Sequence, residues 1–355
     1  MKTILHIVEP LATGIHSFLV DLTDHQCDDY DVYIAYGVRP QTHKNFKSYF
    51  NEKICWIKVE NFHNSIGFKD IKAFFELRKI LNEVNPDIVH LHSSKAGFLG
   101  RWVCNCSKNK VFYTPHGFSF LMQDGTKLKK MFYWITEYFS AKCNKAITIA
   151  CSEGEYKEAL NLSKRCAYVN NGINLYGLDS YLNKVNKTES LQPVVCTSGR
   201  ILTQKNPVLF NQIASQLPDV RFIWIGEGEL RNELKSPNIE ITGWVDRETA
   251  LELTNNSDFF ILPSLWEGLP ISLLEAMYLK KICLVSDVIG NRDVIDNERN
   301  GFICKSVDEY ILNITQMLHD KNKRLEIAEQ AHNDVSILYN ATIMSDKYNE
   351  IYNNS

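Results

Sequence analysis

The sequence predicts an α/β protein with two doubly wound, parallel-sheet domains. Short β-branched runs alternate with longer amphipathic stretches along most of the chain, which is the pattern of βαβ units. The alternation lapses once, in the polar segment 174–193, and then resumes. The 355 residues are too many for one ordinary hydrophobic core and suit two domains.

The first series of elements precedes this lapse. The segment 68–84 places apolar residues near helical spacing and is expected to form a helix. The runs expected to form strands are 3–9, 31–37, 54–60, 87–93, 110–117, 146–152 and 166–173. Alternating strands and helices of this kind give a parallel sheet covered by helices on both faces.

The second series repeats the pattern without repeating the sequence. Its expected strands are 194–200, 221–228, 239–245, 258–264 and 282–290, and its expected helices include 206–217 and 246–255. Two such domains form a cleft, and ligands of such sheets bind beyond the carboxyl ends of the strands.

The composition favours a cytoplasmic protein. The net charge of −3 gives no general attraction to nucleic acid, and no nucleic-acid-binding motif is present. The N-terminus lacks the pattern of a signal peptide, and no window reaches the apolar length of a membrane span. The ten cysteines are scattered and are expected to be reduced thiols.

Two cations follow the first strand of the second series. Arg200 and Lys205 lie in the run TSGRILTQK, at the expected mouth of a strand. A planar guanidinium and a point-like ammonium suit a pyrophosphate, and both would offset the charge that grows on a departing diphosphate. A solvated loop with a surface ion pair explains the same residues equally well.

Two glutamates lie eight positions apart in LWEGLPISLLEAM. Glu267 precedes the expected helix start at Pro270, and Glu275 lies further along the helix, where its oxygens could accept bonds from two vicinal ribose hydroxyls. Gly268 and Leu269 would present backbone groups at this helix start. The alternative is a pair of helix-terminus glutamates favoured by the macrodipole.

A histidine and a glycine in the first half stand at strand ends. His116 follows a strand, and either a structural or a catalytic role fits it. Gly14 follows the first strand as a single glycine, which disfavours a dinucleotide fingerprint but lets backbone approach a phosphate or sugar. His90 and His92 share one strand face, yet no nearby carboxylate or cysteine completes a site, so no metal is expected.

Together these residues resemble the retaining glycosyltransferases of family 4, which have the GT-B fold. The resemblance spans nearly the whole chain and rests on the two glutamates, on Arg200 with Lys205, and on His116-Gly117. The runs TPHGFSF, HLHSSKAGFLGR and IGNRDVI are similar to the bacterial subgroup that builds capsule and O-antigen repeat units of lipopolysaccharide. The GT-B fold consists of two Rossmann-like domains that face a cleft.

The resemblance implies a role for each residue of the site. Arg200, Lys205 and Gly14 would bind the donor diphosphate, and Glu275 the ribose. Glu267 would contact the transferred sugar and steady its developing positive charge, with His116 beside that sugar. The implied uracil-binding residues are Gly243 and Trp244, and the implied sugar-pocket backbone is that of Gly268 and Leu269. Donor binding would need no metal and no other cofactor, because Arg and Lys replace Mg²⁺.

The lapse in the pattern sets the expected domain boundaries, with a first domain over 1–173, a linker over 174–193 and a second domain over 194–335. The resemblance makes the first the acceptor-side domain and the second the nucleotide-sugar-binding domain. The last helix, 336–355, would return to the first domain.

The activity implied by the resemblance is that of a hexosyltransferase. It would move a hexose or N-acetylhexosamine from a UDP-sugar to an undecaprenyl-diphosphate-linked saccharide, forming an α-linkage. One alternative keeps the fold and makes the protein a UDP-sugar 2-epimerase, or a transferase to a small soluble acceptor. Another alternative is a non-catalytic scaffold that binds nucleotide sugars.

The segment 127–145 is a candidate basic amphipathic helix. Its apolar stripe, formed by Leu128, Met131, Phe132, Ile135 and Phe139, is expected to pack on the first domain. The lysines Lys127, Lys129 and Lys130, beside Tyr133 and Trp134, suit the anionic surface of a bilayer. The protein would then be peripheral on the cytoplasmic face of the cell membrane. An ordinary solvated helix is the alternative.

Overall fold

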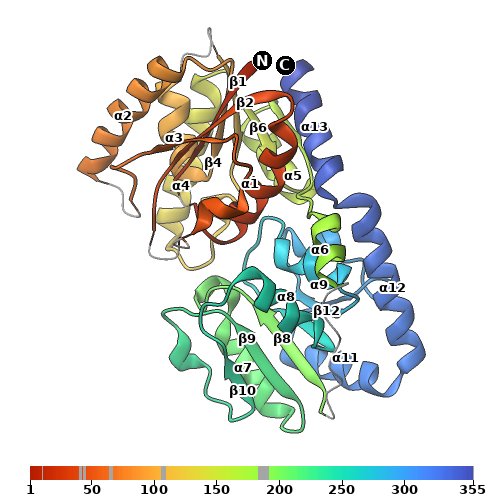
Figure 1. Cartoon of the computed structure of the whole chain (residues 1–355). Helices are drawn as coiled ribbons and strands as arrows, with labels where there is room; N and C mark the ends of the chain where they lie inside the picture. The colour runs from red at the N-terminus through yellow and green to blue at the C-terminus, as the bar shows by residue number, and fades with distance from the viewer. Residues whose placement is uncertain are drawn as a thin grey trace. The chain divides into compact units, whose positions relative to one another are not determined.

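The structure is a computed structural model that describes residues 1–9, 11–39, 42, 45–63, 67–104, 109–182 and 192–354. The chain divides into two compact units. The first comprises residues 1–121, 125–172 and 341–355, and the second comprises 122–124 and 173–340. Each unit contains one parallel sheet (Figure 1).

The first unit has a seven-stranded sheet of order β3-β2-β1-β4-β5-β6-β7. Its strands are β1 (Lys2–Val8), β2 (Tyr30–Tyr36), β3 (Cys55–Lys58), β4 (Ile88–His92), β5 (Lys110–Thr114), β6 (Ile147–Ala150) and β7 (Cys166–Tyr168). Its helices are α1 (Thr13–Gln26), α2 (Phe68–Val84), α3 (Ser94–Val103), α4 (Lys127–Cys143), α5 (Glu153–Leu162) and α13 (Ala341–Asn354), with short 3₁₀ turns at Phe46–Tyr49 and Ser119–Leu121.

The second unit has a six-stranded sheet of order β10-β9-β8-β11-β12-β13. Its strands are β8 (Val194–Ser198), β9 (Arg221–Ile225), β10 (Ile239–Ile241), β11 (Phe259–Leu262), β12 (Ile282–Ser286) and β13 (Phe302–Cys304). Its helices are α6 (Leu175–Leu182), α7 (Pro207–Gln216), α8 (Arg247–Asn255), α9 (Ile271–Tyr278), α10 (Asn291–Val294), α11 (Val307–His319) and α12 (Lys321–Leu338), with 3₁₀ turns at Thr203–Lys205 and Arg231–Glu233.

Both sheets confirm the predicted fold class. Every strand pair is parallel, and in each sheet the strand order reverses beside the first strand. These switch points lie between β1 and β4 and between β8 and β11. Ligands of such sheets bind at the carboxyl ends of the strands at a switch point, so the topology marks one candidate location in each unit.

Two segments bear on the predicted domain boundaries. Within the predicted linker 174–193, residues Leu175–Leu182 form α6, while 183–191 lie outside the described residues. The last helix, α13, belongs to the first unit and packs against α1. The two chain ends therefore lie close together, and Lys2 Nζ donates to Asn353 Oδ1 over 3.4 Å (Figure 1).

The cores of the two units consist of aliphatic and aromatic side chains from the strands and their covering helices. In the second unit Phe210 and Phe222 pack around Trp224, whose side chain is fully buried. The nine described cysteines are free thiols, and most of them are buried. Burial raises the pKa of Cys196 to about 11 and that of Cys304 to about 12, because a thiolate is poorly solvated there.

The packing of α4 corrects the prediction for its apolar stripe. Leu128, Met131, Phe132, Ile135 and Phe139 are not packed on the unit; Leu128 is 73% exposed and Phe139 is 56% exposed. The prediction was wrong because a polar face of the helix is buried instead.

That buried face of α4 carries Glu137, Ser140 and Ala141. Glu137 accepts a hydrogen bond of 2.6 Å from Arg101 Nη2 and one of 2.9 Å from the Tyr113 hydroxyl. These contacts compensate the buried carboxylate, which leaves the apolar side of the helix at the surface.

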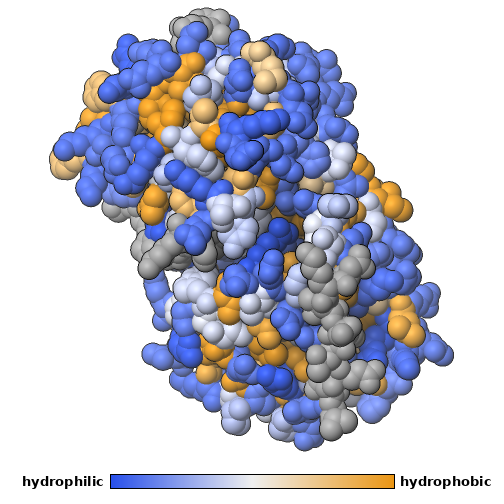
Figure 2. All heavy atoms as spheres, in the orientation of Figure 1, coloured by the Kyte–Doolittle hydropathy of each residue, from blue (hydrophilic) through white to orange (hydrophobic). Residues whose placement is uncertain are grey.

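The face of the molecule shown in Figure 2 is mostly polar. Hydrophilic residues predominate there, and apolar side chains form separate groups. None of the described helices combines the length and the apolar character that crossing a membrane requires.

Candidate active site

The switch point of the second sheet brings three predicted site residues to one place. β8 ends at Ser198, and Gly199 and Arg200 follow it directly. Gly199 has φ +145°, a backbone conformation that favours glycine, and a Cβ there would lie 3.0 Å from Lys205 Cε. The glycine thus lets the Lys205 side chain cross close to the strand end, and the partly exposed Arg200 lies beside it in the chain.

Lys205 and Glu267 form an ion pair at this strand end. Lys205 Nζ lies 2.7 Å from Glu267 Oε1, and the two side chains are 15% and 7% exposed. Gln204 Nε2 donates to Glu267 Oε2 over 3.3 Å and to the Trp266 carbonyl over 3.0 Å. The carboxylate is therefore held from both oxygens, and the loop after β11 is tied to the turn after β8.

The backbone of Gly268 and Leu269 is held from the opposite side by Gly290. Gly290 has φ +83°, and a Cβ there would lie 2.0 Å from the Gly268 carbonyl oxygen and 3.3 Å from the Leu269 nitrogen. Only glycine fits such an approach. Pro270 precedes α9 as its N-cap, one position before the first helical residue, instead of occupying the predicted first turn.

Glu275 lies on α9 and pairs with Arg247 at the start of α8. Arg247 Nε and Nη2 both donate to Glu275 Oε1, over 3.2 and 2.8 Å. Within the described part of the chain, no hydrogen bond to Oε2 is formed. One carboxylate oxygen thus remains able to accept bonds from a ligand.

Gly243 and Trp244 follow β10. Gly243 has φ +73° and forms an isolated bridge with Gly226, the residue after β9. The Thr242 hydroxyl accepts from the Gly226 amide over 3.2 Å and donates to the Gly243 carbonyl over 2.8 Å. This fixed turn leaves the indole of Trp244 54% exposed.

In the first unit, Gly14 and His116 lie on different elements. Gly14 is exposed in the first turn of α1, and a Cβ there would meet no atom within 4 Å, so packing does not require a glycine. His116 follows β5 with φ +53°, and the next amide, Gly117 N, donates to Glu155 Oε1 over 2.6 Å. Glu155 also accepts from Cys151 N, over 2.8 Å, and so fixes the histidine turn.

His116 is the partly exposed member of a histidine cluster. Its Nε2 lies 3.1 Å from His92 Nδ1, and His92 Nε2 lies 3.0 Å from His6 Nδ1. Burial lowers the pKa of His6 to about 4 and that of His116 to about 3, and it holds the pKa values of His90 and His92 well below 6.5. All four rings are therefore neutral near pH 7.

The donor nitrogens of His6, His90 and His92 lie close enough together for a metal ion to be considered. However, both ring nitrogens of each already have hydrogen-bond partners. His6 Nε2 contacts Gln26, while His90 contacts Thr114 and Tyr352. A metal would have to displace these bonds, and the geometry does not favour one.

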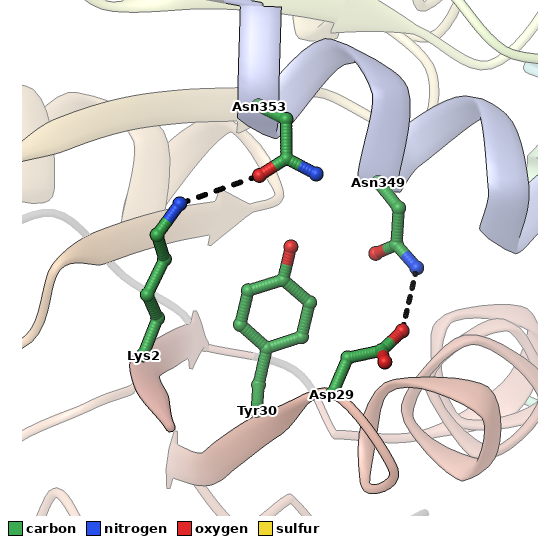
Figure 3. A pocket seen from close by; sticks show the side chains of 5 residues that line it. All are labelled: Lys2, Asp29, Tyr30, Asn349 and Asn353. Carbon is green, nitrogen blue, oxygen red and sulfur yellow. Dashed lines mark hydrogen bonds between the residues drawn. The ribbon is translucent and has the colours of Figure 1, made fainter.

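A polar hollow in the first unit lies away from these residues. It is lined by Lys2, Asp29, Tyr30, Asn349 and Asn353, and Figure 3 shows their polar ends facing one another. Lys2 and Tyr30 are the first residues of β1 and β2, so the hollow lies at the amino edge of the sheet. The candidate site residues occupy the carboxyl edge, where ligands of such sheets bind.

Sequence reasoning missed several residues of this site. Gln204, Arg247, Glu155 and Gly290 hold the predicted residues but carry no chemistry of their own. For Gly290 a signal was present, because it lies in the run IGNRDVI. The partners of Glu267 and Glu275 are 62 and 28 positions away in the chain, and only the sheet topology joins them.

Comparison with known proteins decides the family. The model for Glycosyltransferase Family 4 matches residues 12–176, and that for Glycosyl transferases group 1 matches residues 182–334. The UDP-Gal:α-D-GlcNAc-diphosphoundecaprenol α-1,3-galactosyltransferase of Escherichia coli is 30% identical over 311 residues, which cover 80% of this chain and 79% of that one. The chain belongs to the family 4 glycosyltransferases. The expectation of a hexosyltransferase is thereby confirmed.

Further similar proteins support the same family and fold. A Campylobacter jejuni N,N′-diacetylbacillosaminyl-diphospho-undecaprenol α-1,3-N-acetylgalactosaminyltransferase is 27% identical, covering 80% of this chain and 81% of its own. Among solved structures, Anabaena HepE in complex with UDP and glucose superposes with a TM-score of 0.79 at 14% identity, over 99% of this chain and 100% of that one. This likeness confirms the GT-B fold.

Proposed function

We propose that this glycosyltransferase moves a hexose or N-acetylhexosamine from a UDP-sugar to a lipid-diphosphate-linked saccharide, with retention of the anomeric configuration. The observation that carries the proposal is the largely buried pair of Lys205 and Glu267 at the switch point of the second sheet. The pair supports the proposal because a cation that could neutralise a departing diphosphate lies beside a carboxylate that could face the transferred sugar.

Lys205 can serve the diphosphate without losing Glu267. An ammonium group has three donors, and Glu267 Oε1 takes one of them. The other two can reach phosphate oxygens, and Arg200, next to Gly199, adds a planar fork. Two fixed cations supply the charge that a divalent metal would otherwise supply, so we propose that donor binding needs no metal and no other cofactor.

Glu267 would act on the sugar as positive charge develops at its anomeric carbon. The bond from C1 to the diphosphate oxygen breaks, and an acceptor oxygen bonds to C1 on the same face. The acceptor proton passes to the leaving phosphate oxygen. Since Lys205 and Gln204 hold both oxygens of Glu267, the carboxylate is fixed before substrate binds, which is what electrostatic stabilisation requires.

The nucleoside would lie towards Glu275 and the turn after β10. Glu275 Oε2 can accept from the ribose hydroxyls while Arg247 holds Oε1. The exposed Trp244 ring and the fixed backbone at Gly243 offer a stacking surface and main-chain groups for uracil. In the first unit, the open space around Gly14 suits backbone approach to the diphosphate, and His116 would contact the sugar.

The relatives support the class of acceptor. The names of the Escherichia coli and Campylobacter jejuni enzymes each specify a saccharide on diphosphoundecaprenol. We infer a similar lipid-linked acceptor for this chain, as in the assembly of O-antigen or capsule repeat units. Family 4 membership favours transfer over the 2-epimerase and scaffold alternatives.

The exposed face of α4 suits such an acceptor. Five apolar side chains lie at the surface of this helix, and its lysines Lys127 and Lys129 are exposed beside them. Apolar side chains flanked by cations bind an anionic bilayer surface. We propose that this face rests on the cytoplasmic leaflet, where a lipid-linked saccharide is found.

A donor panel tests the transfer. The purified chain is incubated with UDP-Gal, UDP-GalNAc, UDP-Glc or UDP-GlcNAc and a synthetic sugar-diphosphate-lipid, and the product is read by mass and anomeric NMR coupling. We expect one α-linked product, in EDTA as well as in Mg²⁺. A β-linkage would overturn retention, and a product formed only with a divalent cation would overturn metal independence.

The same panel separates the alternative functions. A new UDP-sugar epimer formed without acceptor would indicate the 2-epimerase. Tight UDP binding with neither transfer nor donor hydrolysis would indicate the scaffold. Transfer to soluble saccharides alone would remove the lipid-linked acceptor.

Co-sedimentation with vesicles tests the α4 face. The variant Lys127→Glu/Lys129→Glu/Lys130→Glu and, separately, Leu128→Ser/Phe132→Ser should lose binding to vesicles that contain anionic lipid. The matched control is Lys235→Glu/Lys305→Glu/Lys321→Glu, which makes the same charge change at exposed lysines of the second unit. Equal binding of all variants would dispose of this membrane surface.

A further inference from the structure

Three histidines, from two strands and from the turn after a third, form one row of hydrogen bonds. It starts at Gln26, the last residue of α1, whose Oε1 lies 2.8 Å from His6 Nε2 on β1. His6 Nδ1 contacts His92 Nε2 at the end of β4, and His92 Nδ1 contacts His116 Nε2 after β5. The row thus runs along the carboxyl side of the first sheet and ends at the one histidine that the resemblance assigns to the sugar.

The first link determines the proton positions in all the others. In the structure the Gln26 amide presents its carbonyl oxygen Oε1 to His6 Nε2. A carbonyl oxygen can only accept, so in this orientation His6 Nε2 carries the hydrogen. A neutral imidazole has one N–H, so His6 Nδ1 is bare and accepts from His92 Nε2. By the same step His92 Nδ1 accepts from His116 Nε2. His116 Nδ1 is then left without a hydrogen.

That last nitrogen is the group that a substrate could reach. None of the described residues forms a hydrogen bond to His116 Nδ1, and the residue is partly exposed, whereas His6 and His92 are fully buried. The backbone on either side is fixed by Glu155 and by the left-handed φ of His116. Phe18 packs against the ring with a centroid distance of 4.6 Å, which restricts its rotation.

We propose that Gln26, His6 and His92 are positioning residues that hold His116 as the Nε2–H tautomer and direct its bare Nδ1 to accept a hydrogen bond from a sugar hydroxyl. The assignment of the sugar rests on the proposed function, while the tautomer does not. The histidine would therefore recognise a hydroxyl donor on the transferred sugar and would not supply a proton to it.

The neighbouring His90 provides a matched control. It lies on the same strand as His92, two residues away, and is equally buried. Its ring contacts the Thr114 hydroxyl over 2.9 Å and the Tyr352 hydroxyl over 2.7 Å, and it forms no bond in the row that leads to His116. Replacing His90 or His92 by Phe therefore exchanges one buried imidazole for a phenyl ring and removes two hydrogen bonds in either case.

The test is an NMR measurement on the substrate-free chain. Long-range ¹H–¹⁵N correlation with ¹⁵N-labelled histidine should show His6, His92 and His116 as Nε2–H tautomers, with a His116 Nε2–H that exchanges slowly with water. His92→Phe should abolish this protection, and His90→Phe should preserve it. An Nδ1–H tautomer at His116, or protection that survives His92→Phe, would overturn the proposal.

A second pair of variants keeps the test decisive if His92→Phe does not fold. Gln26→Glu retains an oxygen that accepts from His6, so the protected signal of His116 should remain. Gln26→Leu removes that acceptor, so the signal should weaken. The same spectra recorded with Zn²⁺ and with EDTA should coincide. A metal ion bound to His6, His90 and His92 would disrupt the hydrogen bonds between the histidines and change the spectra.

Measuring kcat and KM separates a positioning role of His92 from a general loss of folded structure. With a working donor, His92→Phe should lower kcat about tenfold, the typical value of one aligned hydrogen bond. The KM for the donor should change by less than about twofold, since one such bond is small beside the contacts assigned to UDP in the second unit. Equal losses in His92→Phe and His90→Phe would mean that both rings only support the fold.

Discussion

The second unit holds its candidate site residues by ion pairs, whereas the first holds His116 by a row of neutral rings. Lys205 pairs with Glu267, and Arg247 pairs with Glu275. His116, by contrast, ends a chain of histidines whose pKa values burial lowers. Under the proposed function, the charged pairs would serve the departing diphosphate, and a neutral acceptor would suffice to recognise a sugar hydroxyl.

The largest effect is expected from removing the charge of Glu267. Glu267→Gln keeps the shape and an oxygen that accepts from Lys205, but it removes the negative charge. Turnover should fall at least about 100-fold, as for loss of one transition-state charge contact. Glu240→Gln, in the exposed pair with Arg221, is the control. Near-normal turnover of Glu267→Gln would show that the charge of Glu267 is not needed, and the contrast between the two units would not hold.

The next effect concerns how the neutral histidines make the free energy of unfolding depend on pH. In the unfolded chain the histidines titrate near 6.5, whereas the folded pKa values are about 4 for His6 and about 3 for His116. Between those values the unfolded state binds more protons, so the free energy of unfolding should fall as the pH drops from 6.5 to 5. Each neutral ring contributes a slope that rises to at most about 1.4 kcal/mol per pH unit as its unfolded counterpart becomes fully protonated.

Chemical denaturation at several pH values measures this slope. His90→Phe removes one titrating ring and should make the slope shallower. A flat profile between pH 6.5 and pH 5 would mean that the rings are not neutral in the folded state.

A smaller effect is expected at Glu275. Glu275→Gln keeps one oxygen but weakens its bonds to the ribose hydroxyls, so the KM for the UDP-sugar should rise about tenfold with kcat less affected. Steady-state kinetics and calorimetry with UDP measure it. If kcat fell instead with KM unchanged, Glu275 would belong to the chemistry and not to the nucleoside.

The smallest effect is expected at the exposed pair of Arg221 and Glu240. Its side chains are about half exposed, so Glu240→Gln should change the free energy of unfolding by less than about 0.5 kcal/mol. Glu267→Gln should lower the free energy of unfolding by more than this. It leaves the ammonium of Lys205, whose side chain is only 15% exposed, without its negatively charged partner. Equal costs in urea denaturation would show that burial does not distinguish the two pairs.

The sequence predicted the elements with strong periodicity well. Helix α2 has the bounds expected from its apolar spacing, and it stops at Asn85, which adopts the left-handed conformation of a helix end. Strand β13, Phe302–Cys304, was not predicted. The helix expected over 127–145 is present as α4, but its packing was predicted wrongly. Periodicity shows which face is apolar but not that Arg101 and Tyr113 compensate Glu137 on the opposite face.

The sequence predicted which residues belong to the site but not which of them contact one another. Glu267, Glu275, Arg200 and Lys205 were found because motifs keep residue types at fixed spacing. The pairing of Lys205 with Glu267 depends on β8 and β11 being neighbours in the sheet, which local sequence does not specify. His90 and His92 were expected on one strand face, but the link through His6 to Gln26 joins elements far apart in the chain.

The distribution of free thiols should let a thiol-reactive dye label only a few cysteines of the protein. Thiols react as thiolates, so the buried Cys196, Cys283 and Cys304, whose pKa values burial raises, are inert. Cys55 and Cys143 are the exposed thiols among the described cysteines, and both lie in the first unit. Since Cys143 ends α4, a maleimide dye there would report on the helix that we propose to rest on the bilayer, without an engineered cysteine.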